Sequence, residues 1–188
     1  MNDKDTVRER LRAGRRARGD ADLTAAAAAL ARHGVDALTG VRTVAAYASI
    51  RDEPPTRPLL DALMARAVTV LLPRVDGANL QWASYTSWDD LVSTERGLLE
   101  PTGESLRGNV AERVDAVLLP ALAVDRTGQR LGRGAGYYDR ALAGAHSGAR
   151  LVAVVFDDEV LDLLPSETHD IPVSAALTPS GLIELRTR

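Results

Sequence analysis

Four short apolar runs, rich in β-branched residues, constrain the fold of this chain more than any other feature. They lie at residues 41–50, 68–73, 114–120 and 151–156. Each run stays apolar along most of its length, which is typical of strands buried on both faces of a parallel sheet. Helical patterns at residues 22–33 and 58–67 accompany them. This order predicts a three-layer α/β/α sandwich with a largely parallel, Rossmann-like central sheet.

The remaining segments give weaker structural signals. Residues 80–85 alternate as an edge or antiparallel strand does, and residues 173–177 and 182–185 fit two short final strands. Residues 86–113 read as loop and short helix, without an assignable geometry. No internal repeat or low-complexity linker interrupts the chain, so we expect a single domain over residues 1–188.

A glycine-rich segment at residues 130–140 carries the strongest functional signal. It reads Arg-Leu-Gly-Arg-Gly-Ala-Gly-Tyr-Tyr-Asp-Arg and leads into a helical pattern. Alternating glycines permit positive φ angles and expose consecutive N–H groups, which together with a helix N-terminus bind phosphate oxygens. Arg130 and Arg133 could contact the same phosphates through charged bidentate bonds, and Asp139 is a hard oxygen ligand suited to Mg²⁺.

A simple tight turn is the alternative interpretation of this segment. Two familiar phosphate-binding motifs are excluded, because the segment has no Gly-Lys-Ser/Thr ending and its glycines are not spaced Gly-x-Gly-x-x-Gly. The flanking arginines and the carboxylate nevertheless favour an anion-binding loop of another kind.

Two other charged features have both a functional and a structural interpretation. Residues 4–18 predict an amphipathic helix whose basic stripe includes Lys4, Arg8 and Arg15, either a solvated face or a strip that meets a polyphosphate. Glu53 follows the first predicted strand, where open α/β sheets bind ligands, although a polar loop tip would look the same.

Trp82 could stack on a flat ligand ring or belong to the core.

Composition excludes several classes of protein. The formal net charge of −3 argues against a general nucleic-acid or membrane-surface binder. The chain has no cysteine and three histidines, which excludes disulfides and thiolate chemistry and argues against a histidine-rich metal centre. No apolar run approaches the roughly 18 residues of a membrane span, and the polar first residues do not resemble a secretory signal. We therefore expect a cytoplasmic monomer that binds neither nucleic acid nor membrane.

These motifs together resemble the 5-formyltetrahydrofolate cyclo-ligase (5,10-methenyltetrahydrofolate synthetase) family, and the resemblance covers nearly the whole chain. The family signature is similar to the sequence from Leu119 to Asp125, Gly128, and the glycine-rich segment up to Asp139. Other matching features, in chain order, are Lys4 with Val7-Arg8 and Arg15, Glu53 to Thr56, Pro73-Arg74, Leu164-Pro165, and His169-Asp170-Ile171-Pro172.

The resemblance implies an ATP- and Mg²⁺-dependent conversion of 5-formyltetrahydrofolate into 5,10-methenyltetrahydrofolate, ADP and phosphate. It implies an ATP site made by Lys4, Arg8, Arg130, Leu131, Gly132, Arg133, Gly134, Ala135, Gly136, Tyr137 and Tyr138. It implies a folate site made by Ala48, Glu53, Arg133, Gly134, Ala135, Gly136 and Tyr137. Catalytic roles fall on Arg133, Tyr137 and Asp139, and the implied Mg²⁺ ligands are Asp139 and Asp170.

The chain departs from the family pattern at Ala135, where the family often has glycine or lysine, so this chain lacks a charge that lysine would bring. One alternative function is a non-catalytic folate- or nucleotide-binding relative on the same fold. Another is a phosphosugar isomerase or transferase of similar architecture, which would turn over without ATP.

Overall fold

A seven-stranded sheet forms the centre of the protein. The computed structural model describes residues 4–106, 110, 113–142, 148–165 and 171–186. The strand order is β12-β11-β9-β6-β1-β2-β3. The strands are β1 (Thr43–Ala45), β2 (Thr69–Asp76), β3 (Asn79–Ser84), β6 (Ala116–Pro120), β9 (Arg150–Val154), β11 (Ala175–Thr178) and β12 (Gly181–Glu184). The strands from β11 to β2 are parallel, and the edge strands β3 and β12 pair antiparallel with β2 and β11.

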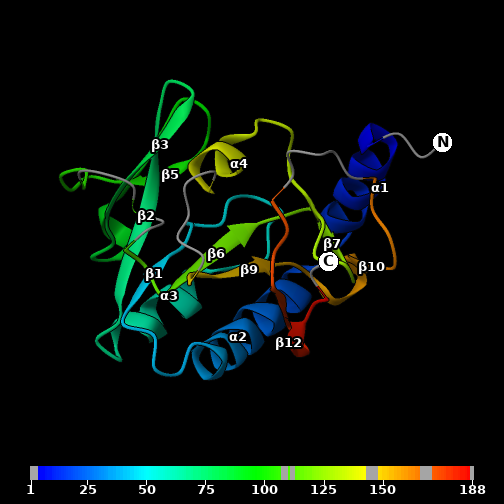
Figure 1. Cartoon of the computed structure of the whole chain (residues 1–188), viewed down its shortest axis with the longest axis horizontal. Coiled ribbons are helices and arrows are strands. Elements are labelled where there is room, and N and C mark those ends of the chain that lie inside the picture. Colours follow the sequence, from blue (N-terminus) through cyan, green and yellow to red (C-terminus); the bar gives the residue numbers. More distant parts are fainter. Residues whose placement is uncertain (1–3, 107–109, 111–112, 143–147, 166–170, 187–188) are drawn as a thin grey trace.

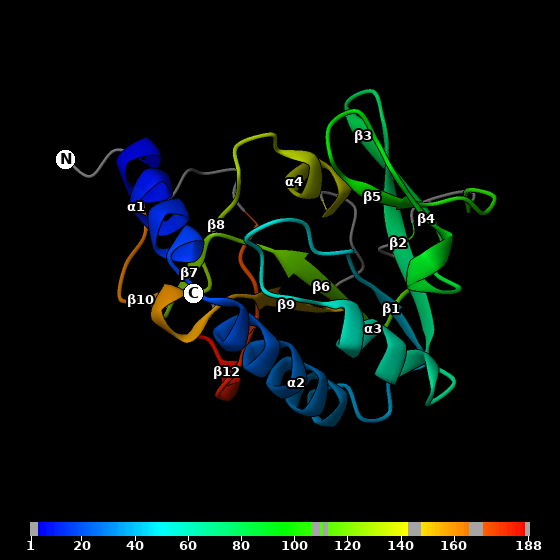
Figure 2. The ribbon, with the colours of Figure 1, turned by 180° about the vertical axis from the view of Figure 1, so that it is seen from behind.

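Apolar side chains cover both faces of this sheet, as strands buried on two sides require. On β6, Ala116 and Leu118 belong to one buried cluster, whereas Val117 and Leu119 belong to another. The first cluster packs under α2 (Asp20–Ala37) and α3 (Arg57–Met64), and the second includes Leu142 of α4 (Tyr137–Leu142). Figures 1 and 2 show α2 and α3 on one side of the sheet and α4 on the other.

Local sequence signals explain where helices α2 and α3 begin. The Asp22 carboxylate accepts a hydrogen bond from the Gly19 N–H at 3.2 Å, which satisfies a donor ahead of the first turn of α2. Pro58 lies in the first turn of α3, where a missing N–H costs nothing. The alanine-rich sequence of α2 then continues the helix to Ala37.

A smaller three-stranded sheet adjoins the carboxyl end of the central strands. It contains β7 (Ala123–Asp125), β8 (Arg130–Leu131) and β10 (Val160–Leu161), in the order β10-β7-β8. Helix α1 (Lys4–Arg16) packs on it through Val7 and Leu11, which belong to a cluster with Leu122 and Leu131. Figure 1 shows α1 beside β7 and β10, close to the beginning of the chain.

The predicted fold class is confirmed, one predicted strand is too long, and two small sheets were not predicted. The expected strand at 41–50 pairs only from Thr43 to Ala45, because the next residues turn away in a loop that hydrogen bonds between Ser49 and Thr56 close at 2.9 and 3.0 Å. Residues 86–113 contain an unexpected hairpin of β4 (Leu91–Ser93) and β5 (Leu99–Pro101), besides the 3-10 turn η1 (Trp88–Asp90). The β7–β8–β10 sheet was also missed, since its strands have only two or three residues. The single-domain boundary stays a prediction.

Candidate active site

The carboxyl ends of β1 and β6 frame the candidate active site. The chain leaves β1 toward β2 on one side and leaves β6 toward β9 on the other, so β1 and β6 form a topological switch point. In open α/β sheets the crevice outside such a point binds the ligand. A cavity of about 430 Å³ lies there, lined by residues that follow β1 (Tyr47 and Ala48) and residues at the end of β6 (Pro120 and Ala121).

The glycine-rich loop between β8 and α4 forms one wall of the cavity. Gly134 and Gly136 have φ angles of +104° and +67°, a region that other residues adopt only with strain. Helix α1 is tied to this loop, because the Arg8 Nε donates to the Gly132 carbonyl at 3.1 Å. Lys4 and Arg8 of α1 line the cavity together with the loop, although α1 and the loop lie more than 120 positions apart in the sequence.

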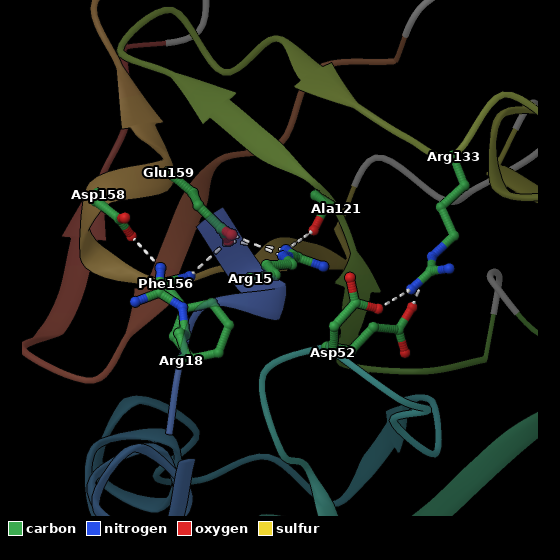
Figure 3. Close-up of polar contacts among 9 residues, drawn as sticks. Arg15, Arg18, Asp52, Ala121, Arg133, Phe156, Asp158 and Glu159 are labelled. Atoms are coloured by element: carbon green, nitrogen blue, oxygen red, sulfur yellow. Dashed lines mark hydrogen bonds and ion pairs between the residues drawn. The ribbon is translucent and has the colours of Figure 1, made fainter. Parts of the chain in front are cut away.

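Three ion pairs hold the two arginines of the glycine-rich segment, Arg130 and Arg133. The Arg130 Nη2 donates to Asp139 Oδ1 at 2.7 Å, so this buried guanidinium and the carboxylate at the start of α4 fix each other. The Arg133 Nε lies 3.1 Å from Glu53 Oε1, and its Nη2 lies 3.3 Å from Asp52 Oδ1. Figure 3 shows Arg133 reaching across to Asp52. Arg133 thus connects the glycine-rich loop to the loop that follows β1.

Glu53 is an unusually buried carboxylate. Its side chain is 7% exposed, and its Oε2 accepts a hydrogen bond from the Ile50 N–H at 2.9 Å. Burial raises the pKa of Glu53 above its ordinary value, while the Arg133 charge and the Ile50 N–H oppose that rise. A carboxylate accepts up to about four hydrogen bonds, so Glu53 keeps acceptor capacity for a ligand in the cavity.

The buried Tyr47 and the partly buried Tyr138 line the same cavity. Burial, and then the negative charge of Glu53, raise the pKa values of Tyr47 and Tyr138 well above that of a free phenol. Both hydroxyls therefore stay protonated and act as neutral groups. Tyr137 also lines the cavity, and its hydroxyl accepts a hydrogen bond from Arg96 Nη1 at 2.6 Å.

The donor set around Asp139 fits Mg²⁺ beside a polyphosphate. Mg²⁺ is commonly held by one or two carboxylates, with substrate phosphates and water as its other ligands. Asp139 lines the cavity, its side chain is 26% exposed, and the bond to Arg130 leaves it further lone pairs. Asp170, the second predicted ligand, lies outside the described residues. Within the described ranges no group of three or more acidic or histidine side chains forms a metal cage.

The structure brings almost every predicted site residue to this one cavity. The residues that line it as expected are Lys4, Arg8, Ala48, Glu53, Arg130, Leu131, Gly132, Arg133, Gly134, Ala135, Gly136, Tyr137, Tyr138 and Asp139. Their individual roles toward ATP, folate and Mg²⁺ stay predictions. Trp82 is a core residue, 6% exposed and in edge contact with Tyr138 at 6.5 Å between ring centroids. Arg15, from the basic stripe, is also buried and does not reach the cavity.

Sequence reasoning missed the apolar wall of the cavity. This wall comes from β2, β3 and the β4–β5 hairpin, through Pro73, Val75, Leu80, Leu98 and Leu99, together with Ile50. Glu100 also lines it, and its Oε1 accepts from the Val75 N–H at 3.0 Å. The only available signal was the Pro73-Arg74 pair of the family resemblance, because apolar residues on strands look the same whether they line a cavity or a core.

Comparison with known proteins finds one family along most of the chain. A model of the 5-formyltetrahydrofolate cyclo-ligase family matches residues 1–179. A 5-formyltetrahydrofolate cyclo-ligase of Mycolicibacterium smegmatis is 47% identical over 152 residues, which are 77% of this chain and 78% of that protein. The Escherichia coli K12 cyclo-ligase is 34% identical over 146 residues, 76% of this chain and 80% of the relative.

A solved structure matches the fold over nearly its full length. The NMR structure of 5,10-methenyltetrahydrofolate synthetase from Aquifex aeolicus superposes with a TM-score of 0.78 at 27% identity, covering 98% of this chain and 94% of that one. The described helices include none long and apolar enough to cross a membrane. On the family match and these relatives, the chain belongs to the 5-formyltetrahydrofolate cyclo-ligase family and is an enzyme of that class.

Proposed function

We propose that the chain catalyses the ATP- and Mg²⁺-dependent cyclisation of 5-formyltetrahydrofolate to 5,10-methenyltetrahydrofolate. In this reaction the formyl oxygen attacks the γ-phosphorus of ATP and the bond to ADP breaks. N10 then attacks the activated formyl carbon, closes the ring, loses its proton and expels phosphate. The substrate supplies the nucleophile, so the protein needs no serine, cysteine or histidine for that role.

The observation that carries the proposal is the composition of the cavity. The cavity brings together the glycine-rich loop, the cations of Lys4, Arg8 and Arg130, and the buried carboxylate of Glu53. Phosphoryl transfer mainly requires positioning and neutralisation of charge, which exposed N–H groups and fixed guanidinium groups supply. Mg²⁺ bound at Asp139 would neutralise further phosphate charge.

Glu53 and the apolar wall suit the folate. A pterin presents a ring N–H next to an amino group, and a carboxylate can accept both as charge-assisted hydrogen bonds. Leu98 and Leu99 offer apolar area on the same cavity for the flat ring. Because Arg133 pairs with Glu53 and also belongs to the glycine-rich loop, it would sit between the folate and the γ-phosphate, where the formyl oxygen reacts.

The test is to mix the protein with 5-formyltetrahydrofolate, ATP and Mg²⁺ and to follow the absorbance of the methenyl product. Product that depends on both ATP and Mg²⁺, with ADP formed in equal amount, would support the proposal. Binding of both ligands without product would favour a non-catalytic relative. Product formation that does not require ATP would refute the proposed mechanism.

A further inference from the structure

A buried ion pair outside the cavity anchors helix α1. The Arg15 Nε and Nη2 donate to the two Glu159 carboxylate oxygens at 2.6 and 2.8 Å, and both side chains are at most 2% exposed. The Arg15 Nη2 also donates to the Ala121 carbonyl at 2.6 Å. Figure 3 shows Arg15 between Glu159 and Ala121. Glu159 is itself held, because its Oε2 accepts from the Phe156 N–H at 2.8 Å.

These contacts connect α1 to the frame of the active site. Ala121 directly follows β6 and lines the cavity, while Phe156 and Glu159 follow β9, the next strand of the sheet. Arg15 therefore fixes the end of α1 to the carboxyl ends of two neighbouring central strands.

The opposite end of α1 carries the two cations that reach the cavity. Lys4, Arg8 and Arg15 lie at helical spacing on one side of α1, with Leu11 between them. The distance along the axis from residue 15 to residue 4 is about 16 Å, since each residue rises about 1.5 Å. A tilt of about 10° at Arg15 would move the Lys4 end by about 3 Å, which exceeds the tolerance of a hydrogen bond.

Two further contacts of α1 constrain this tilt less. Val7 and Leu11 pack on the small sheet through apolar contacts, which are not directional. Arg8 makes a single bond to the Gly132 carbonyl. By contrast, a bidentate arginine–carboxylate pair fixes orientation as well as distance. A buried ion pair is a poor source of stability, because the desolvation of both charges offsets their attraction.

We propose that Arg15 and Glu159 are positioning residues of the ATP subsite, which set the orientation of α1 so that Lys4 and Arg8 meet the triphosphate. This inference rests on the proposed function, because it takes the phosphates to bind beside the glycine-rich loop. Neither residue touches the substrate; both act through the helix.

The decisive variant replaces both charges by apolar side chains, Arg15→Met with Glu159→Met. Replacing a buried ion pair in this way is often neutral for stability, whereas removing one partner leaves an unpaired buried charge. We expect the double variant to fold with a lower melting temperature than the wild type, because the Phe156 N–H and the Ala121 carbonyl each lose a hydrogen-bond partner. We also expect a rise of at least about 10-fold in the KM for ATP, because small misplacements of positioning groups are costly. The KM for 5-formyltetrahydrofolate should change much less.

Two further variants keep the test decisive. Arg15→Lys retains the charge but loses the two-pronged contact, so the KM for ATP should lie between the wild-type and double-variant values. If the double variant does not fold, the KM for ATP of Arg15→Lys tests the positioning role in its place. Asp158→Asn is the matched control, because it removes the exposed pair with Arg18 from the same turn and should leave both KM values unchanged.

The inference would be overturned if the folded double variant had an unchanged KM for ATP. If the double variant is unfolded, an unchanged KM for ATP in Arg15→Lys would overturn it. Equal rises in both KM values would also overturn it, because they would indicate a general disturbance. Lys4→Ala and Arg8→Ala separate this failure from failure of the proposed function. If they too leave the KM for ATP unchanged, the proposed ATP subsite itself is wrong.

Discussion

Gly134→Ala tests the claim that the glycine-rich loop binds phosphate through its backbone. The nearest atoms to an added Cβ are 3.9 Å away, on the Arg8 guanidinium, so the methyl group meets no steric obstacle. The effect of the substitution comes from the φ angle of +104°, because a residue with a Cβ is strained there by about 1–3 kcal/mol. The loop of the variant should relax to a conformation without this strain. ATP binding must then return the loop to its strained conformation, which costs binding free energy.

This reasoning gives a magnitude for the effect on binding. A penalty of about 1–3 kcal/mol corresponds to an increase of about 5- to 150-fold in the KM for ATP. If the loop instead keeps its conformation, the strain appears in the fold and lowers the melting temperature by about 2–4 °C per kcal/mol. Steady-state kinetics with varied ATP and a thermal melt of the same sample measure both quantities.

Gly40→Ala is the matched control for this experiment. Gly40 has a φ angle of +84° with nothing within 4 Å of an added Cβ, and it does not line the cavity. It should lower the melting temperature and leave the KM for ATP unchanged. If Gly134→Ala changed neither the melting temperature nor the KM for ATP, the loop would not require its positive φ angle, and the phosphate-cradle reasoning would fail.

Three other predictions concern side chains of the cavity. Asp139→Asn should lower turnover by at least about 100-fold, because it removes the charge of the proposed metal ligand yet keeps a partner for Arg130. Single-turnover kinetics measure this, and near-normal turnover would exclude Asp139 as a ligand. Lys4→Ala should raise the KM for ATP, and an unchanged value would make the N-terminal basic stripe a solvated face. Glu53→Gln should weaken folate binding and change the pH dependence of stability. Because burial raises the pKa of Glu53 in the folded state, the native protein binds more protons, and the wild type loses unfolding free energy as the pH rises from the ordinary glutamate pKa through the raised value. Urea unfolding at several pH values should show the variant gaining stability relative to the wild type over that rise, and parallel profiles would contradict the raised pKa.

Local patterns in the sequence were sufficient for the fold class and for much of the candidate site. Continuous apolar runs identified parallel strands, because burial on both faces leaves no polar alternation. Glycines at alternate positions identified the loop, since their freedom to adopt positive φ is a property of the residue itself and is seen at Gly134 and Gly136. The family resemblance, carried by residues 119–139 and the flanking motifs, added Ala48 and implied the roles of Lys4, Arg8 and Glu53.

Only the tertiary structure decided which charged side chains line the cavity and which are buried in ion pairs outside it. Arg8 and Arg15 lie on the same stripe of α1, yet Arg8 lines the cavity and Arg15 is enclosed with Glu159. The sequence does not distinguish them, because each partner lies more than 120 residues away and is brought close by the sheet. The apolar wall of the cavity was equally hidden, since a leucine on a strand reads the same whether a ligand or a neighbouring helix covers it. Residue type and spacing determine what a segment can form, but long-range packing determines what each side chain meets.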